Sequence, residues 1–245
     1  MTEPTCAGGR GYRRTADTIG TVTEIIPADD TALVRQRAAA QLTEGELIVA
    51  PTDTAYAVFA DAFQMDATQR LLDARSQPRS RPLPVIVRSP RQLAGLVKEQ
   101  TEQAERLVAA FWPGPLTLIF RANEGLAWDL GDMHGAVAVR MPDEPMLYEL
   151  VAEVGPLAFT AASTMGAPAP TTVEGARDLL GDRVALYIDG GPRPGGRSTI
   201  VDVSRGGAEV LRAGAVSSDE VFAAATGAID WGNPAEQETT DREEN

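Results

Sequence analysis

Short apolar segments alternate with longer helix-forming segments along the chain, and this alternation constrains the fold more than any other feature of the sequence. The apolar segments are rich in Val, Ile and Leu, which favours β-strands. We predict strands over residues 46–50, 83–88, 115–120, 136–141, 156–161, 183–188, 198–203 and 208–212. We predict helices over residues 32–43, 66–75, 89–97, 101–111, 143–154, 173–180 and 217–226. Strands separated by helices indicate an α/β protein.

The spacing between the predicted strands indicates how they pair. The strands between residues 115 and 141, and those between 183 and 212, follow each other without a helix, which favours antiparallel hairpins. We therefore expect a mixed sheet within one domain at 23–227. Residues 1–22, rich in Gly, Thr and Arg, predict a flexible N-terminal arm, and the polar, acidic residues 228–245 predict a disordered tail.

Charge and rare residue types disfavour several kinds of function. The formal net charge is −13, so we expect weak or no direct RNA binding through phosphates. The chain has one Cys, one His (His134) and one Lys (Lys98), which argues against a disulfide framework, a Ser-His-Asp hydrolase, a two-histidine metal site and a Schiff-base lysine. No apolar run approaches the roughly 20 residues of a membrane helix, and no secretory signal is visible, so we expect a cytoplasmic protein.

The segment PTDTAY at residues 51–56 follows the first predicted strand and is a candidate binding site. In α/β sheets, ligands usually bind where strands end. The hydroxyls of Thr52 and Thr54 and the carboxylate of Asp53 offer donors and acceptors for a small polar substrate. The alternative is a turn that begins a helix, because Thr and Asp are preferred at such positions.

A basic stretch lies between residues 70 and 91. It holds six arginines and one acidic residue, Asp73, in a chain that is acidic overall. Arginine forks match phosphate oxygens, so this stretch favours a polyphosphate ligand. The alternative is a solvated basic surface.

Three further features are candidates. Arg140 ends the apolar segment 136–141, where a buried charge requires a partner, either a substrate carboxylate or a structural Asp. The glycine-rich residues 190–197 precede the strand beginning at Ser198 and can present backbone N–H groups to an anion. The aromatic and proline-rich residues 111–117 indicate a rigid packing corner.

Taken in order, the motifs of residues 40–220 resemble those of the YrdC-like threonylcarbamoyl-AMP synthase family. They are PTDT-x-Y at 51–56, FWPGPLT at 111–117, VAVRMP at 137–142, PTT at 170–172, DGG at 189–191, STIVD at 198–202 and LRAG at 211–214. The resemblance implies a twisted mixed sheet with flanking helices around a large concave cleft. It also implies an enzyme, a nucleotidyltransferase that joins L-threonine, bicarbonate and ATP, with magnesium, into threonylcarbamoyl-AMP and pyrophosphate. This product serves a threonylcarbamoyl modification of tRNA, which makes tRNA-modification proteins candidate partners.

The resemblance assigns roles to individual residues. On the threonine side it implies Thr52, Thr54, Arg140 and Ser198. On the nucleotide side it implies Arg75, Arg79, Ala136, Ser163, Thr171 and Arg212. None of them is a nucleophile, because this reaction needs reactants to be aligned and growing charge to be neutralised.

Two stretches depart from the family pattern. Arg75-Ser76-Gln77 stands where the family usually has Lys-x-Arg, and Ala161-Ala162-Ser163 stands where it usually has Ser-x-Asn. These changes lie on the nucleotide side. They keep a second hypothesis open, a divergent non-catalytic paralogue that binds a nucleotide or RNA.

Overall fold

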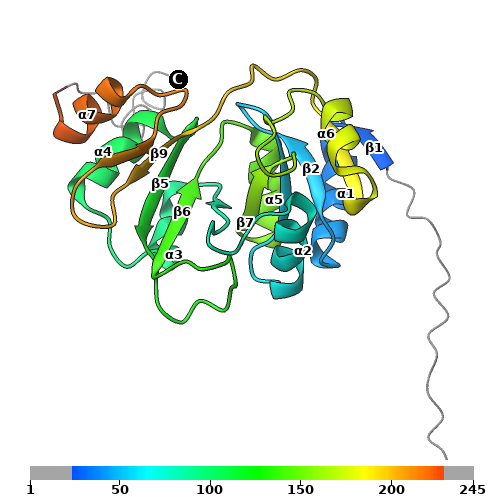
Figure 1. Cartoon of the computed structure of the whole chain (residues 1–245), viewed down its shortest axis with the longest axis horizontal. Helices are drawn as coiled ribbons and strands as arrows, with labels where there is room; N and C mark the ends of the chain where they lie inside the picture. Colours follow the sequence, from blue (N-terminus) through cyan, green and yellow to red (C-terminus); the bar gives the residue numbers. More distant parts are fainter. Residues whose placement is uncertain (1–23, 229–245) are drawn as a thin grey trace, which may run out of the picture.

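The computed structural model describes residues 24–228 and shows one mixed β-sheet flanked by helices (Figure 1). The predicted N-terminal arm and, apart from residue 228, the predicted tail lie outside the described residues. The strand order is β1-β8-β2-β3-β7-β4-β6-β5-β9-β10. The strands are β1 (Glu24–Pro27), β2 (Ile48–Pro51), β3 (Tyr56–Asp61), β4 (Val85–Ile86), β5 (Leu116–Arg121), β6 (Ala136–Arg140), β7 (Leu157–Ala161), β8 (Leu186–Asp189), β9 (Thr199–Asp202) and β10 (Glu209–Arg212).

The helices lie close to their predicted positions. They are α1 (Thr31–Thr43), α2 (Met65–Arg75), α3 (Leu93–Leu96), α4 (Glu102–Phe111), α5 (Pro145–Val154), α6 (Val173–Leu180) and α7 (Ser218–Thr226), with short 3-10 turns at Pro90–Gln92 and Gly181–Arg183. Several begin at a capping side chain. Asp30 accepts a hydrogen bond from the N–H of Leu33 at the start of α1, and Ser217 and Glu220 form a capping box at α7. Among these helices none is both long and apolar enough to cross a membrane.

The sheet is mixed, as predicted, and its pairing corrects one detail. Strands β5 and β6 form the expected antiparallel hairpin, and so do β9 and β10. Strand β8 does not join that second hairpin, because it lies between β1 and β2 and is parallel to both. The chain therefore crosses from one half of the sheet to the other over residues 190–198, which run along the top of Figure 1.

Two apolar cores pack on opposite faces of the sheet. On one face the sheet packs against α2, α3, α4, α6 and α7. On the other face α1 and α5 cover the half that contains β1, β8, β2, β3 and β7, where Phe59 stacks on Phe159 at 5.9 Å between ring centroids. This second core ends at Ile86 of β4. The same face therefore continues over β6, β5, β9 and β10 without residues of α1 or α5 against it.

This open half of the face carries rows of side chains that strand pairing fixes. Residues paired directly across neighbouring strands point to the same side of a sheet. Arg140 pairs with Thr117, Thr117 with Ile200, and Ile200 with Arg212, so these four form one row across β6, β5, β9 and β10. The next row begins with Ala138 and Ile119, both only partly buried.

Candidate functional site

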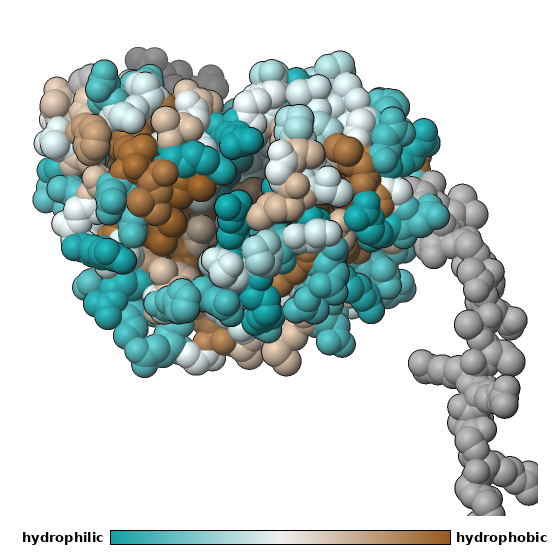
Figure 2. Space-filling view, viewed as in Figure 1, coloured by the Kyte–Doolittle hydropathy of each residue, from teal (hydrophilic) through white to brown (hydrophobic). Residues whose placement is uncertain are grey.

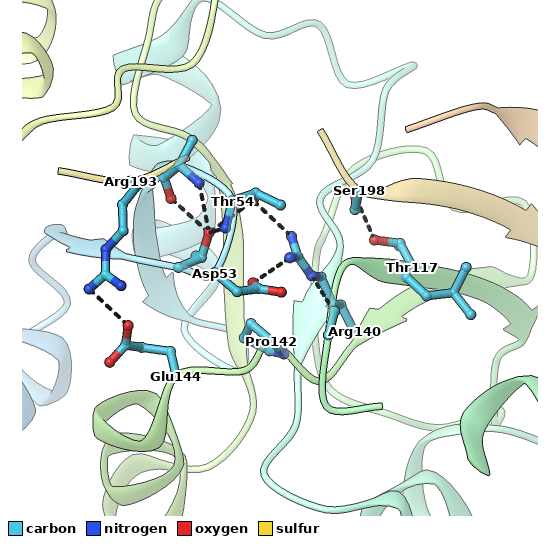
Figure 3. A network of polar contacts seen from close by, with 12 residues as sticks. Asp53, Thr54, Thr117, Arg140, Pro142, Glu144, Arg193 and Ser198 are labelled. Atoms are coloured by element: carbon cyan, nitrogen blue, oxygen red, sulfur yellow. Dashed lines mark hydrogen bonds and ion pairs between the residues drawn. The ribbon is translucent and has the colours of Figure 1, made fainter. Parts of the chain in front are cut away.

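The turn after β2 is rigid, and the hydroxyl of Thr52 makes it so. Thr52 Oγ1 accepts hydrogen bonds from the N–H groups of Thr54 and Ala55, each at 3.2 Å, and donates to the carbonyl of Ala55 at 2.7 Å. The turn joins the antiparallel strands β2 and β3, so the structure does not show the helix start that was the alternative interpretation of this motif. The turn directs the side chains of Asp53 and Thr54 toward Arg140 (Figure 3).

Arg140 is the most buried charge at the site, with 3% of its surface exposed. Its Nη2 donates to Asp53 Oδ1 at 2.5 Å, its Nε to the carbonyl of Gly114 at 3.1 Å, and its Nη1 lies 3.5 Å from Thr54 Oγ1. Of the two predicted partners, the structure thus supplies the acidic residue. Burial lowers the pKa of Arg140, and the charge of Asp53 opposes that change.

The predicted packing corner positions the carbonyl that binds Arg140. Trp112 Nε1 donates to the carbonyl of Leu116 at 2.8 Å, and the N–H of Gly114 donates to the carbonyl of Met141, also at 2.8 Å. A Cβ at residue 114 would lie 2.7 Å from the carbonyl oxygen of Phe111. The corner therefore requires glycine at this position.

On the other side of Arg140 lie Thr117 and Ser198, as Figure 3 shows. Their hydroxyl oxygens are 2.9 Å apart, and both side chains are buried. Arg212 Nη2 donates to the carbonyl of Ser198 at 2.8 Å and to its hydroxyl at 3.1 Å. The structure thus brings Thr54, Arg140, Ser198 and Arg212 together.

Arginines gather around Arg140 and Ser198, and we call Arg75, Arg140, Arg197 and Arg212 the arginine cluster. The pKa of Arg212 is lowered most by burial and next by the positive charges of Arg197, Arg140 and Arg75. The pKa of Arg75 is likewise lowered most by burial and next by the charges of Arg197 and Arg81. Like charges perturb each other only when they lie close together. In the ion pairs of residues 24–228, Asp53 is the acid that pairs with this cluster, so the cleft carries an excess of positive charge suited to an anion.

Ser163 lies beside the arginine cluster, whereas Thr171 contacts the crossing segment. Ser163 is fully buried, and its Oγ lies 3.5 Å from Nη1 of Arg75, which also donates to the carbonyl of Ala161 at 2.7 Å. Nε of Arg75 is buried without a hydrogen-bond partner among the described residues. Thr171 is exposed, and its carbonyl accepts from the N–H of Arg193.

The glycine-rich crossing segment is tied to the rest of the protein. The N–H of Gly195 donates to the carbonyl of Thr54 at 2.8 Å, and Tyr56 Oη donates to the carbonyl of Gly191 at 2.8 Å and accepts from the N–H of Gly190. Arg193 pairs with Glu144 at 2.9 Å. These N–H groups therefore hold the segment in place over the turn, and the predicted use of the loop as an anion cradle is not supported by them.

Two predicted nucleotide residues lie elsewhere. Arg79 is exposed and pairs with Asp129 at 2.6 Å and with Asp132 at 3.8 Å. Ala136 begins β6, on the same face as Arg140 but roughly 13 Å along the strand. It lines a cavity of about 510 Å³ that also includes the following residues: Lys98, Arg121, Ala122, Glu124, Met133, His134, Gly135, Asp202, Ser204 and Arg205.

Space is open beside the polar row. Figure 2 shows a hollow between the two halves of the molecule, with apolar surface on the side of β5, β6 and β9. Ile119, Ala138 and Ile200 are partly exposed there. A second cavity, of about 440 Å³, lies between α1 and α5, away from the row. Within residues 24–228 no group of three or more His, Cys, Asp or Glu side chains is arranged to hold a metal ion.

Sequence interpretation named Asp53 as a candidate contact of a polar substrate, but it assigned no role to Thr117 or Arg197. Asp53 and Thr117 lie inside motifs that were recognised, but only the register of the strands shows that Thr117 lies beside Arg140. Arg197 precedes Ser198, and its proximity to Arg75 and Arg212 requires the crossing of the chain between the two halves of the sheet.

The fold and the site define a class of protein: a mixed α/β protein whose sheet, covered by helices on only half of one face, places arginines, hydroxyls and apolar side chains together on the uncovered half. The sequence model of the Sua5/YciO/YrdC family, described as "Telomere recombination", matches residues 40–214. The chain belongs to this family, and the predicted resemblance is confirmed.

Named relatives agree with this assignment. A protein of Mycobacterium tuberculosis named "Putative threonylcarbamoyl-AMP synthase" is 45% identical over 178 residues, which cover 72% of this chain and 82% of the relative. The threonylcarbamoyl-AMP synthase of Bacillus subtilis is 34% identical over 82% of this chain and 59% of the relative. The crystal structure of Pyrococcus abyssi Sua5 complexed with L-threonine has a TM-score of 0.73 and 32% identity, covering 82% of this chain and 59% of that chain.

Proposed function

We propose that this protein is an L-threonylcarbamoyladenylate synthase, which condenses L-threonine, bicarbonate and ATP to threonylcarbamoyl-AMP and pyrophosphate. The observation that carries the proposal is the row Arg140, Thr117, Ile200 and Arg212 on the open face, with Ser198 beside it. It gives an amino-acid carboxylate and a polyphosphate separate cationic partners within one cleft. Relatives that are 34–45% identical are named as synthases for this reaction.

Arg140 is the proposed partner of the threonine carboxylate. An arginine side chain has five N–H donors, and only three contacts to protein atoms engage them here. Donors are therefore left for a carboxylate despite the ion pair with Asp53. Thr54 and Ser198 would contact the same substrate, while Thr52 would act through the turn that it closes.

Arg75 and Arg212 are the proposed partners of the ATP phosphates. Both belong to the arginine cluster, and Ser163 and Thr171 lie beside Arg75 and the crossing segment. The apolar floor leads from Arg140 toward the cavity of about 510 Å³ that includes Ala136, a size that suits the adenosine part. Arg79 would contribute only if it left its two aspartates. Magnesium would enter with the phosphates, as it commonly does in nucleotide sites.

The chemistry then needs no side-chain nucleophile. The deprotonated amine of threonine attacks carbon dioxide with loss of a proton, or bicarbonate with loss of water, to form a carbamate. A carbamate oxygen then attacks the α-phosphorus, from which pyrophosphate leaves. The arginines would neutralise the charge that grows on the phosphate oxygens, and the row of side chains would fix the distance between the carbamate and the phosphorus.

The second hypothesis, a non-catalytic paralogue that binds a nucleotide or RNA, receives less support. It was based on the changes at Gln77 and at Ala161 and Ser163. The named relatives support the synthase, and Arg75 and Ser163 lie at the cluster in this chain. Because the product serves tRNA modification, we place the protein in the cytoplasm and expect tRNA-modification proteins as its partners.

The test is pyrophosphate release from purified protein with threonine, bicarbonate, ATP and magnesium. We expect release that depends on threonine, and we expect Arg140→Ala to remove it by deleting the carboxylate partner. Arg88→Ala, a change of an exposed arginine, should leave it intact. Circular dichroism would verify that the Arg140 variant is folded. Release no greater than in a control without threonine would refute the synthase proposal.

A further inference from the structure

The carboxylate of Asp53 uses only one of its two oxygens. Oδ1 accepts the hydrogen bond from Arg140, while Oδ2 is buried and has no hydrogen-bond partner among the described residues. An ionised carboxylate accepts hydrogen bonds on both oxygens, and burying an unsatisfied acceptor is costly. This arrangement leaves one acceptor of the ion pair unsatisfied. The unpaired oxygen therefore points to a donor that is supplied by a ligand.

The position of Asp53 limits what that donor is. Asp53 and Arg140 face each other within the cleft, and Thr54 lies beside them (Figure 3). The side chain of Asp53 is only 14% exposed, so a group that reaches Oδ2 must enter the cleft with the ligand. The remaining N–H donors of Arg140 belong to the same guanidinium group that pairs with Oδ1 of this carboxylate. The pair thus presents an anionic acceptor and cationic donors side by side.

This polarity matches an α-amino acid. Its ammonium and carboxylate groups are attached to the same carbon atom, and they carry opposite charges. We propose that Asp53 Oδ2 accepts a hydrogen bond from the α-ammonium group of the substrate while Arg140 binds its carboxylate, so that the ion pair recognises the zwitterion as a unit. This inference rests on the proposed function, because it places the amino acid in the threonine subsite.

The proposal assigns Asp53 a role in specificity. A 2-hydroxy acid satisfies Arg140 as well as an amino acid does, but it brings only a neutral hydroxyl to Asp53. A hydrogen bond to a charged group contributes about 1.5–3 kcal/mol, which corresponds to roughly 10- to 150-fold in affinity. Asp53 also positions the nitrogen atom, which becomes carboxylated after the ammonium group has lost a proton to solvent, so the effect of Asp53 on the reaction is one of positioning.

The experiment compares two ligands on two proteins. Calorimetry would measure the affinities of L-threonine and of 2,3-dihydroxybutanoate, its analogue with a hydroxyl in place of the amine. We expect the native protein to prefer threonine by at least about tenfold and Asp53→Asn to reduce that preference to less than about threefold. If Asp53 had a merely structural role, Asp53→Asn would weaken the binding of both ligands alike and leave the ratio of their affinities unchanged. As a control, Glu144→Gln changes a neighbouring carboxylate that pairs with Arg193, and we expect it to leave this ratio as in the native protein.

Two results would overturn the inference. One is a native protein that binds both ligands equally, which needs no variant and is informative even if Asp53→Asn does not fold. The other is a folded Asp53→Asn protein with an unchanged ratio. Threonine-dependent pyrophosphate release together with either result would leave the synthase standing and refute only the role of Asp53. If Asp53→Asn lost the preference for threonine over 2,3-dihydroxybutanoate but the native protein released no pyrophosphate, the amino-acid subsite would be established and the synthase refuted.

Discussion

Arg212→Gln provides the most direct test of the proposed phosphate site. Arg212 holds the carbonyl and hydroxyl of Ser198, and Arg197, Arg140 and Arg75 are close enough to lower its pKa. Without a ligand these positive charges repel one another, so the cluster is unfavourable for the protein alone. An anion reverses that effect. A variant without this charge should therefore bind polyphosphates more weakly, although its folded state loses one source of repulsion.

The expected magnitude follows from the contact that is lost. A charged hydrogen bond to a phosphate oxygen contributes about 1.5–3 kcal/mol, so the Kd for ATP should rise roughly 10- to 150-fold. Adenosine, which has no phosphate, should bind native protein and variant alike. The loss should be smaller at high salt, because salt screens the attraction in the native protein.

Calorimetric titration with ATP and magnesium would measure this change, and two control variants sharpen it. Arg91→Gln changes an exposed arginine of the basic stretch at residues 70–91 and should leave the Kd for ATP within about twofold. Arg79→Gln tests the prediction made from the family resemblance. Its guanidinium is already paired with Asp129 and Asp132, so we expect a smaller effect than for Arg212. An unchanged Kd for ATP in folded Arg212→Gln protein would refute the phosphate site.

Three further changes have defined outcomes. Tyr56→Phe should lower the free energy of unfolding in urea by about 1–3 kcal/mol, because it removes a hydroxyl that bonds Gly190 and Gly191; an unchanged midpoint would contradict this. Thr117→Val should raise the KM for threonine and Thr117→Ser should not, because the hydroxyl orients Ser198; equal effects in kinetic assays would argue against that role. The hydrogen bond from Arg79 holds the pKa of Asp129 below its ordinary value, so its stabilisation is present above the unfolded-state pKa and disappears as the pH falls through the folded-state pKa. Asp129→Asn should remove this loss of unfolding free energy at low pH, which is less than about 1 kcal/mol for an exposed pair. Urea unfolding at several acidic pH values would measure it.

The sequence predicted most elements of the fold because their apolar periodicity is strong. Strands β1 and β3 were missed for different reasons. Strand β1 is short and lies at the edge of the sheet, whereas β3 follows the PTDT turn and has no polar alternation because five of its six residues are buried. Strand order was beyond prediction, since β8 and β9 are close in sequence yet lie in different halves of the sheet.

Residues of the site that belong to sequence motifs could be predicted, whereas contacts that depend on strand register could not. Thr54, Arg140, Ser198 and Arg212 belong to recognised motifs, and the structure brings them together. The acidic partner of Arg140 stayed open at the sequence level, because a distance across 87 residues of sequence depends on the fold.

The departure from the family pattern at residue 77 suggests a role for Arg197. Gln77 occupies a place where the family usually has a positive charge. Here its side chain is engaged, since Nε2 donates to the carbonyl of Arg81 at 2.7 Å and Oε1 accepts from Thr160 at 3.2 Å. Of the neighbouring charges, that of Arg197 has the largest effect on the pKa of both Arg75 and Arg212. We therefore expect Arg197 to supply from the crossing segment the charge that the basic stretch lacks.

This compensation predicts that positions 77 and 197 are energetically coupled in ATP binding. Arg197→Ala should weaken ATP binding, and adding Gln77→Arg to that variant should restore most of the loss. In the native protein, Gln77→Arg should increase the affinity for ATP only slightly, because it adds a like charge beside Arg75 and Arg197. The double-mutant cycle on the Kd for ATP should give a coupling free energy of about 0.5–3 kcal/mol. Two charges that serve the same ligand should each matter more when the other is absent. Additive effects of the two changes on the Kd for ATP would therefore show that the charge at 197 does not replace the one missing at 77.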